Sequence, residues 1–338
     1  MTATRVPLRD LGRTGLVVSR LGLGLAAVGR PGYINLGRDA DLGDARTPDD
    51  LAQRSAELLD AALAAGIRYV DVARSYGRAE EFLRRWLDDR GTARDALVVG
   101  SKWGYRYTAG WRVDAPVHEE KEHSLARFRT QLDESRRILG DRLDLYQIHS
   151  ATVDSGALAD EALLAALVEE RRGGAVRALG VTLSGPASER ALELALAARV
   201  DGERVFDSVQ ATFNCLEPSL AGALAGAHRE GVGVIAKEVH ANGRLTGANR
   251  RPEDATIAAQ LARIARAAGA SPDQVALAWV LAHPFVDVAL SGAATTAQLA
   301  SHVAAAARSL PAEASEALVR LAEPRDVYWK TRARLPWS

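Results

Sequence analysis

Four residues suited to proton transfer stand at, or shortly after, the ends of three strand-like runs in the first half of the chain. They are Asp71, Tyr76, Lys102 and His149, and the runs are Arg68–Asp71, Leu97–Lys102 and Leu143–His149. If these runs are consecutive parallel strands, the four side chains meet at one rim of a barrel, where barrel enzymes place their chemistry. Their order and position predict a catalytic site.

The chemistry that this set predicts is proton donation to a substrate oxygen. A tyrosine phenol has an unperturbed pKa of about 10, so it is a poor acid at neutral pH. We expect the Lys102 ammonium to stabilise the phenolate of Tyr76, lower its pKa and make donation feasible. Asp71 would hold the ammonium in place. His149 would donate a hydrogen bond that polarises and orients a carbonyl group.

Each of the four residues also has an ordinary structural interpretation. Asp71 and Lys102 could form a structural ion pair, Tyr76 could pack in a pocket wall, and His149 could be a hydrogen-bonded rim residue. Their joint placement favours catalysis. The set holds a proton donor and an electrostatic clamp, but neither a nucleophile nor a metal-ligand sphere. A cofactor must therefore supply the missing component, and hydride complements a proton arriving at a carbonyl oxygen. Carbonyl reduction, or its reverse, is predicted.

Short apolar strands alternate with longer amphipathic helices along the chain, which is typical of a parallel α/β fold. Strands are predicted at Leu21–Leu25, Arg68–Asp71, Leu97–Lys102, Leu143–His149, Ala178–Thr182, Ser208–Ala211, Gly233–Glu238 and Val286–Leu290. Helices are predicted at Pro48–Ala65, Ala79–Asp89, Ser124–Leu139, Ala162–Gly173, Pro186–Ala198, Leu220–Gly231, Thr256–Ala268 and Ala297–Ser309. Eight of each predict a (β/α)8 TIM barrel in which residues 1–338 form a single domain.

Further elements are expected around this barrel. A Gly-containing link at residues 12–15 joins two apolar runs and predicts an N-terminal β-hairpin that could plug one end. Extra helices are predicted at Pro272–Ala282 and Pro311–Leu321. Long loops follow strands one, three and seven, at Ala26–Thr47, Trp103–His123 and Val239–Ala255. They should overhang the rim that carries the four polar residues, and long loops in a compact domain are usually functional.

Composition narrows the class of partner. The chain has 338 residues with 43 acidic and 43 basic side chains, so no net field recruits nucleic acid or an anionic membrane. Cys215 is the only cysteine, which excludes an internal disulfide and a cysteine-built zinc site. The charged run His118–His123 is interpreted as a solvated face rather than a metal site. Because no secretory signal or spanning apolar run is evident, we expect a cytoplasmic protein acting on a small molecule, with its oligomeric state open.

The chain resembles the aldo-keto reductases from the N-terminal hairpin to about His302. The motifs that carry the resemblance are Asp71-x-Ala73-x-x-Tyr76-Gly77, Ser101-Lys102-x-Gly104, Gln147-Ile148-His149, the strand with Gln210, and Gly243-Arg244-Leu245-Thr246-Gly247. This resemblance implies an eight-stranded barrel that binds a nicotinamide cofactor in extended form. It also implies that Tyr76 is the acid, that Lys102 and Asp71 tune it, and that His149 orients the substrate.

The resemblance also implies which residues hold the cofactor. Relatives end the fifth strand in a Ser-Asn pair that binds the carboxamide, whereas this chain has Thr182 and Leu183 there. Gln210 matches the carboxamide-binding glutamine. Relatives stack an aromatic residue on the nicotinamide after strand seven, whereas this chain has Lys237 followed by Glu238. The remaining cofactor-binding residues implied by the resemblance are Gly243, Arg244, Leu245, Gly292, Gln298 and His302.

The choice between NADP and NAD is open on the sequence. The glycines of residues 243–247 would let backbone N–H groups approach the pyrophosphate. A flexible surface turn is the ordinary alternative for this segment. NADP-preferring relatives place Lys or Arg around residues 291–302 to pair with the 2′-phosphate. Gly292 and Gln298 stand at the usual positions of those cations. NADP is the family default, and NAD stays an alternative.

Aromatic residues concentrate in the segments expected to overhang the rim. Such residues are typical of a pocket wall that binds a sugar ring or another flat, partly apolar substrate. They could equally pack the loops against the barrel. The predicted substrate-binding residues are Trp103, Tyr105, Tyr33, Trp111 and Trp329. Residues 322–338, which also contain Trp337, are predicted to form a tail over the rim.

We therefore predict an NAD(P)-dependent oxidoreductase that reduces an aldehyde or ketone, with Tyr76 as the proton donor and a sugar-like metabolite as the substrate class. One alternative is an NAD-dependent aldose dehydrogenase that converts a lactol to a lactone at the same site. A second is a non-catalytic, nicotinamide-sensing regulatory subunit, which the departures at Leu183 and Lys237 favour. A third is a barrel lyase or epimerase that uses the tyrosine and lysine without an external cofactor.

Overall fold

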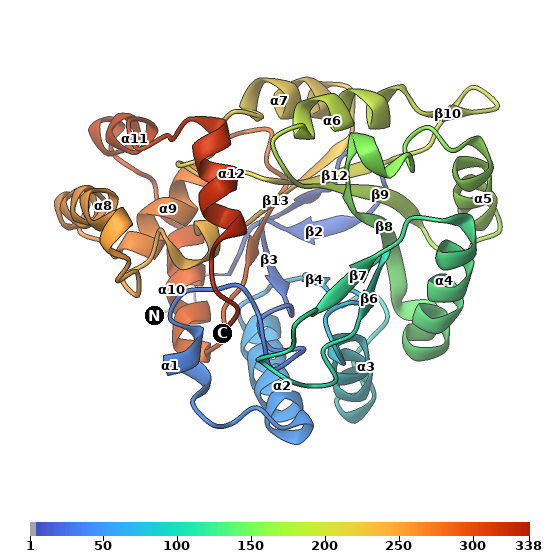
Figure 1. The fold of residues 1–338 in the computed structure, drawn as a ribbon, viewed down its shortest axis with the longest axis horizontal. Coiled ribbons are helices and arrows are strands. Elements are labelled where there is room, and N and C mark those ends of the chain that lie inside the picture. The colour runs from blue at the N-terminus through green and yellow to red at the C-terminus, as the bar shows by residue number, and fades with distance from the viewer. Residues whose placement is uncertain (1–4) are drawn as a thin grey trace.

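Eight parallel strands close into a barrel in the computed structural model, which describes residues 5–338 (Figure 1). The strands are β3 (Leu21–Gly24), β4 (Tyr69–Asp71), β5 (Val98–Trp103), β8 (Leu143–Ala151), β9 (Ala178–Leu183), β12 (Ser208–Thr212), β13 (Gly233–Lys237) and β14 (Val288–Ser291). Neighbours in the closed sheet follow chain order, and β14 pairs with β3 to complete the circle. The predicted barrel is confirmed.

Helices surround the barrel in a ring that alternates with its strands (Figure 1). They are α2 (Pro48–Ala64), α3 (Ala79–Asp89), α4 (Leu125–Leu139), α5 (Glu161–Arg172), α6 (Ser188–Ala197), α7 (Ala221–Arg229), α8 (Ala255–Ala267), α9 (Pro272–Leu281) and α10 (Thr296–Ala306). Local sequence determines several of their starts. At α2, for example, the Thr47 side chain and Asp50 form a reciprocal capping box, with Pro48 in the first turn.

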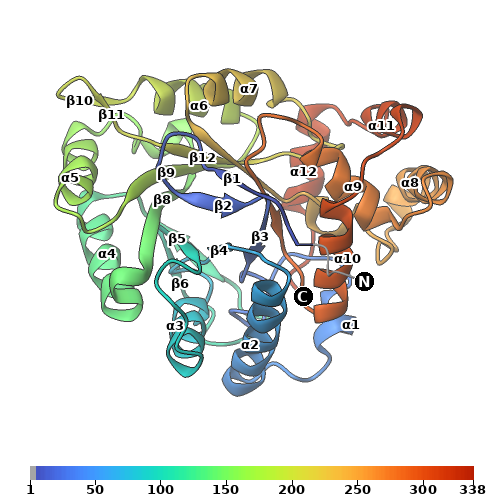
Figure 2. The same cartoon turned by 180° about the vertical axis from the view of Figure 1, so that it is seen from behind.

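The N-terminal hairpin closes the end of the barrel opposite the predicted rim (Figure 2). It consists of β1 (Leu8–Asp10) and β2 (Val17–Ser19), which pair antiparallel. Its buried residues Leu11, Leu16 and Val18 join a cluster with inward side chains of the barrel strands, such as Tyr69 and Ile235. Filling this end with apolar side chains leaves only the C-terminal end of the barrel open to a ligand.

The long connections contain elements that periodicity did not predict. A short helix, α1 (Arg38–Leu42), interrupts the first loop, and a hairpin of β6 (Tyr105–Tyr107) and β7 (Glu119–Lys121) projects from the loop after β5. The C-terminal segment predicted as a tail contains α12 (Arg325–Ala333), after α11 (Ala312–Val319). The remaining elements are β10 (Arg199–Val200), β11 (Glu203–Arg204) and 3-10 turns at Gly140–Arg142, Val153–Ser155, Ala241–Gly243 and Pro252–Asp254. These elements are too short or too polar for an apolar period to reveal them.

Within residues 5–338, no helix combines the length and the apolar character needed to cross a lipid bilayer.

Candidate active site

A cavity of about 610 Å³ opens at the C-terminal end of the barrel. Its wall includes Asp71, Tyr76 and His149 from the first half of the chain and Gln210 and Lys237 from the second half. This volume lies in the range of small-molecule and cofactor sites. The parallel barrel therefore brings together the residues that the sequence analysis singled out, and it does so at the predicted rim.

Lys102 connects the predicted acid to its predicted partner. Its side chain is fully buried behind the cavity wall, and its ammonium forms an ion pair with Asp71. The same Nζ donates to the Val72 carbonyl at 3.0 Å and lies 3.3 Å from the Tyr76 phenol oxygen. A charge placed this way can stabilise a phenolate as a proton leaves Tyr76.

Asp71 is held by more than the lysine. Gln210 Nε2 donates to Asp71 Oδ2 at 2.9 Å, and the Tyr69 hydroxyl donates to the same oxygen at 3.1 Å. Gln147 Nε2 lies 3.4 Å from that oxygen. Buried carboxylates need such donors, because an unpaired charge away from water costs several kcal/mol. The orientation of Lys102 is thus determined by donors from several barrel strands.

The pKa of Tyr76 differs from the prediction. Burial, followed by the nearby charge of Asp71, raises the pKa of this phenol well above its ordinary value, while Arg30 opposes the shift. The sequence analysis expected Lys102 to lower it. The direction is reversed because Asp71 neutralises the lysine charge and burial penalises the phenolate. Tyr76 is consequently protonated at neutral pH, which is the form that a proton donor requires.

His149 lies edge-on to Tyr76, with 5.5 Å between ring centroids. Burial, together with Lys102, Lys237 and Arg30, lowers its pKa well below the ordinary histidine value, so the ring is neutral. The Ser75 hydroxyl is 3.4 Å from Nδ1. A neutral ring that accepts at Nδ1 carries its hydrogen on Nε2 and can donate it to a substrate oxygen.

Two ion pairs line the cavity near these residues, and sequence reasoning missed both. Arg30 forms a 2.5 Å ion pair with Glu119 of β7 and lies over the rings of Tyr33, Tyr76 and Trp337 at 5.0–5.5 Å. Arg332 of α12 forms a 2.7 Å ion pair with Glu238. The partners of each pair are far apart in the sequence, so only the folded chain brings them together.

The other end of the cavity is lined by residues from the second half of the chain. Those that the sequence analysis proposed for the cofactor and that the structure places there are Gly243, Gly292, Gln298 and His302. His240 and Asp273, which the sequence analysis did not propose, also line this end. The His240 and His302 rings stack with centroids 4.5 Å apart, and burial lowers the pKa of His302 to about 3. This end of the cavity is therefore lined by two neutral imidazoles and the Asp273 carboxylate.

Gly243 of the glycine segment approaches the first loop closely. Its φ is 89°, and a Cβ there would lie 2.8 Å from the Leu36 carbonyl oxygen, so only glycine fits. Glu238 and Ser150, which also line the cavity, have left-handed φ values of 53° and 52°. Strained backbone of this kind clusters at functional sites.

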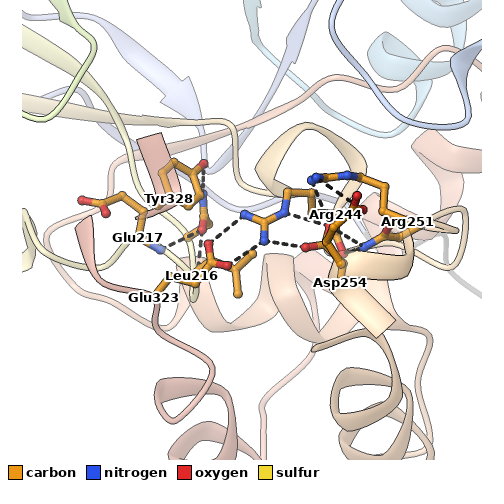
Figure 3. Close-up of polar contacts among 10 residues, drawn as sticks. Leu216, Glu217, Arg244, Arg251, Asp254, Glu323 and Tyr328 are labelled. Atoms are coloured by element: carbon orange, nitrogen blue, oxygen red, sulfur yellow. Dashed lines mark hydrogen bonds and ion pairs between the residues drawn. The ribbon is translucent and has the colours of Figure 1, made fainter. Parts of the chain in front are cut away.

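Arg244 of the same segment has a structural role instead of facing the cavity. Its buried guanidinium forms 2.7 Å ion pairs with Asp254 and Glu323, and Arg251 adds a second ion pair to Asp254 (Figure 3). Arg244 and the fully buried Leu245 do not line the cavity. The network ties the loop after β13 to the chain that leads into α12.

Three of the predicted substrate-binding aromatic residues also lie away from the cavity wall. Trp103 is fully buried and packs on Phe128 in the core. Trp111 donates its indole N–H to the Arg46 carbonyl at 2.8 Å, and Trp329 is buried beside Tyr328. The residues that do line the wall are Tyr33, Tyr105 and Trp337. Aromatic composition predicted an aromatic wall, but which rings reach it depends on loop packing.

Thr182, which was predicted to bind the cofactor, does not line the cavity either. It is fully buried, and its hydroxyl accepts a 2.6 Å hydrogen bond from the Ser150 backbone N–H. The neighbouring residue that lines the cavity is Ser184.

Comparisons with known proteins identify related sequences and a similar fold. The sequence model of the Aldo/keto reductase family matches residues 21–323. The chain is 27% identical to "Aldo-keto reductase str7" of Strobilurus tenacellus, over 98% of this chain and 96% of that protein. It is also 27% identical to a "6-dehydroglucose reductase" of Novosphingobium aromaticivorans, over 86% of this chain and 88% of that protein. The fold matches the holo form of aldo-keto reductase AKR11C1 from Bacillus halodurans with a TM-score of 0.71 and 23% identity, over 94% and 97% of the two chains.

Proposed function

Since this chain belongs to the aldo/keto reductase family of oxidoreductases, we propose that its cavity binds a reduced nicotinamide dinucleotide beside an aldehyde or ketone and reduces the carbonyl group. The observation that carries this proposal is the contact between the Lys102 ammonium and the Tyr76 phenol at the cavity wall, backed by Asp71.

The residues present suit such a cofactor. The cavity continues from Tyr76 and His149 to the β14–α10 junction at Gly292, so an extended ligand can reach both ends. Gln210, also on the wall, offers an amide to a carboxamide, and Gly243 lines the cavity without a side chain. The bound cofactor would supply the hydride; the protein's task is to orient the carbonyl and to deliver a proton.

The proton comes from Tyr76 in this proposal. His149 donates a hydrogen bond to the carbonyl oxygen and holds it near the phenol. As negative charge develops on that oxygen, the Tyr76 proton moves to it, and the Lys102 ammonium stabilises the phenolate that is left. In this direction the protonated phenol of Tyr76 acts as the acid, whereas in lactol oxidation the phenolate would act as the base.

A polyhydroxylated, sugar-like carbonyl compound is the substrate class that the wall supports best. The paired Arg30 and Glu119, and the paired Arg332 and Glu238, offer donors and acceptors side by side. Trp337 offers an aromatic face next to Arg30. Alternating donors and acceptors match hydroxyl groups, and aromatic faces match the C–H surfaces of a sugar. The relative named as a dehydroglucose reductase is consistent with this class.

The test is turnover of a panel of aldehydes, ketones and oxidised sugars with NADH and NADPH. Tyr76→Phe should lower kcat by about 10²–10⁴, which is the usual contribution of a general acid, and should leave cofactor binding unchanged. Tyr107→Phe serves as the matched control, because Tyr107 does not line the cavity. Unchanged turnover in Tyr76→Phe would refute the proposed role, and tight cofactor binding without turnover by the wild type would favour a sensing subunit.

A further inference from the structure

The end of the cavity remote from His149 is built around the junction of β14 and α10. The barrel order places β14 four strands from β8, which carries His149, so the two lie on opposite sides of the barrel. If the nicotinamide lies beside Tyr76, as the proposed function requires, the adenosine half of an extended dinucleotide reaches this junction. The polar groups at this junction therefore decide whether an adenosine with or without a 2′-phosphate can bind.

Two carboxylates flank this adenosine end. Asp273, at the start of α9, lines the cavity and accepts a 2.6 Å hydrogen bond from the Ser301 hydroxyl. Asp41, on α1, lies behind the wall and accepts a 2.7 Å hydrogen bond from Nε2 of Gln298, which lines the cavity. Among residues 5–338, neither carboxylate forms an ion pair with a lysine or arginine. His302 lies 3.9 Å from Asp273 but is neutral at physiological pH.

Cations of the cavity wall all belong to the other end. In the part of the chain that the structure describes, the lysines and arginines on the wall are Arg30, Lys237 and Arg332. Arg30 lies beside Tyr76, Arg332 pairs with Glu238, and Lys237 ends β13 next to Glu238. Arg54 donates to the Ala294 carbonyl at 3.3 Å, but it does not line the cavity. A phosphate at the adenosine end would thus meet the Asp273 carboxylate, with no cation among the described residues on the wall there.

Three backbone donors at the same junction are already occupied. A helix N-terminus normally offers free N–H groups to an anion. Here the Ala294 N–H donates to Gln298 Oε1 at 2.8 Å, the Gln298 N–H donates to the Thr295 hydroxyl at 3.2 Å, and the Ala293 N–H donates to the Ser291 hydroxyl at 3.3 Å. The side chains of this segment therefore satisfy three of its backbone donors, and no lysine or arginine of residues 5–338 lines the wall beside them.

From these contacts we infer that the adenosine end selects NAD(H) over NADP(H), with Asp273 as the specificity-determining residue on the wall and Asp41 acting from behind it through Gln298. A free ribose diol donates hydrogen bonds to a carboxylate, as acidic residues do in other NAD sites. A 2′-phosphate carries a charge of about −1.5 to −2 at neutral pH and is repelled. The inference rests on the proposed function and changes the cofactor expected from the family default.

Direct binding measurements test this inference. Titration of the purified protein with NADH and with NADPH, followed by protein fluorescence, should give a Kd for NADH at least about ten-fold lower than that for NADPH. Asp41→Asn and Asp273→Asn should each lower the ratio of the NADPH Kd to the NADH Kd several-fold, chiefly by strengthening NADPH binding. Asp44→Asn removes the same charge from an exposed position nearby and should leave the ratio unchanged. Added salt should also narrow the wild-type ratio, because it screens the repulsion.

A converse variant guards against misfolding of the single mutants. Gln298→Arg combined with Asp41→Asn places a cation on the wall and removes an opposing charge, so NADPH affinity should rise above the wild-type value. Equal or tighter binding of NADPH by the wild type would overturn the inference while leaving the proposed function intact. Failure of both dinucleotides to bind would refute the proposed function and, with it, this inference.

Discussion

Replacing Lys102 by methionine tests the centre of the site. Methionine keeps an unbranched side chain of similar length but removes the ammonium. The change leaves the buried Asp71 carboxylate without its ion-pair partner and leaves the Tyr76 phenol without an adjacent cation. Both the free energy of unfolding and the rate of proton transfer should therefore fall, and the two changes can be measured separately.

The stability cost follows from burial. The exposed fractions of the Lys102 and Asp71 side chains are 0% and 3%, so water cannot replace the lost ammonium. Removing one partner of a buried ion pair costs about 3–5 kcal/mol. The donors from Gln210 and Tyr69 remain and place the expected cost toward the lower end of that range. Adding Asp71→Asn to Lys102→Met should recover part of the loss, because the buried charge is then gone.

Urea unfolding of the wild type, the two single variants and the double variant gives the coupling energy between the residues. Turnover should be lost in Lys102→Met and should not return in the double variant, since neither protein can stabilise a Tyr76 phenolate. A free energy of unfolding within about 1 kcal/mol of the wild type would refute the argument, because it would mean that Asp71 is solvated or protonated. Recovery of turnover in the double variant would refute the role of the ammonium.

Three further predictions concern the surroundings of the site. Arg244→Met should cost about 3–5 kcal/mol in urea unfolding because it leaves the buried Asp254 unpaired, and a smaller loss would show that the network is solvated. His123 has a pKa lowered to about 4 by burial, so its contribution to stability is complete above the unfolded value near 6.5 and is lost as the pH falls. Between about pH 7 and 5, the free energy of unfolding of His123→Phe should accordingly fall by about 2 kcal/mol less than that of the wild type. The same pH dependence in the variant and the wild type would contradict this. Trp337→Ala should raise the substrate KM about ten-fold with little change in kcat or NADH affinity, whereas a fall in kcat alone would place Trp337 outside the substrate pocket.

The barrel and the four residues Asp71, Tyr76, Lys102 and His149 could be predicted from the sequence, because the patterns that indicate them are local. Strand and helix periods alternate strictly, and the N-terminal capping boxes of α2 and α9 are formed by residues three positions apart. Parallel strands with right-handed connections bring their carboxyl ends to one rim. Once the strands were identified, the meeting of Asp71, Lys102 and His149 followed from topology, without knowledge of any side-chain contact.

Loop-borne contacts could not be predicted in this way. Arg30 and Glu119 are 89 residues apart and meet only because the first loop and the β6–β7 hairpin fold over the same rim. Trp103 and Trp337 have the same residue type, yet one packs in the core and the other faces the cavity. The pKa of Tyr76 likewise depends on the depth of burial, which sequence spacing does not encode.

By itself, then, the sequence determined the barrel, its hairpin plug and the identity of the four rim residues, since these depend on short-range periodicity and on topology. Only the tertiary structure decided which loop residues form the cavity wall, that Arg244 stabilises a loop instead of lining the cavity, and that Asp273 lies on the wall near α10. The physical reason is that loop packing is set by long-range contacts among irregular segments, whose free energies no local pattern records.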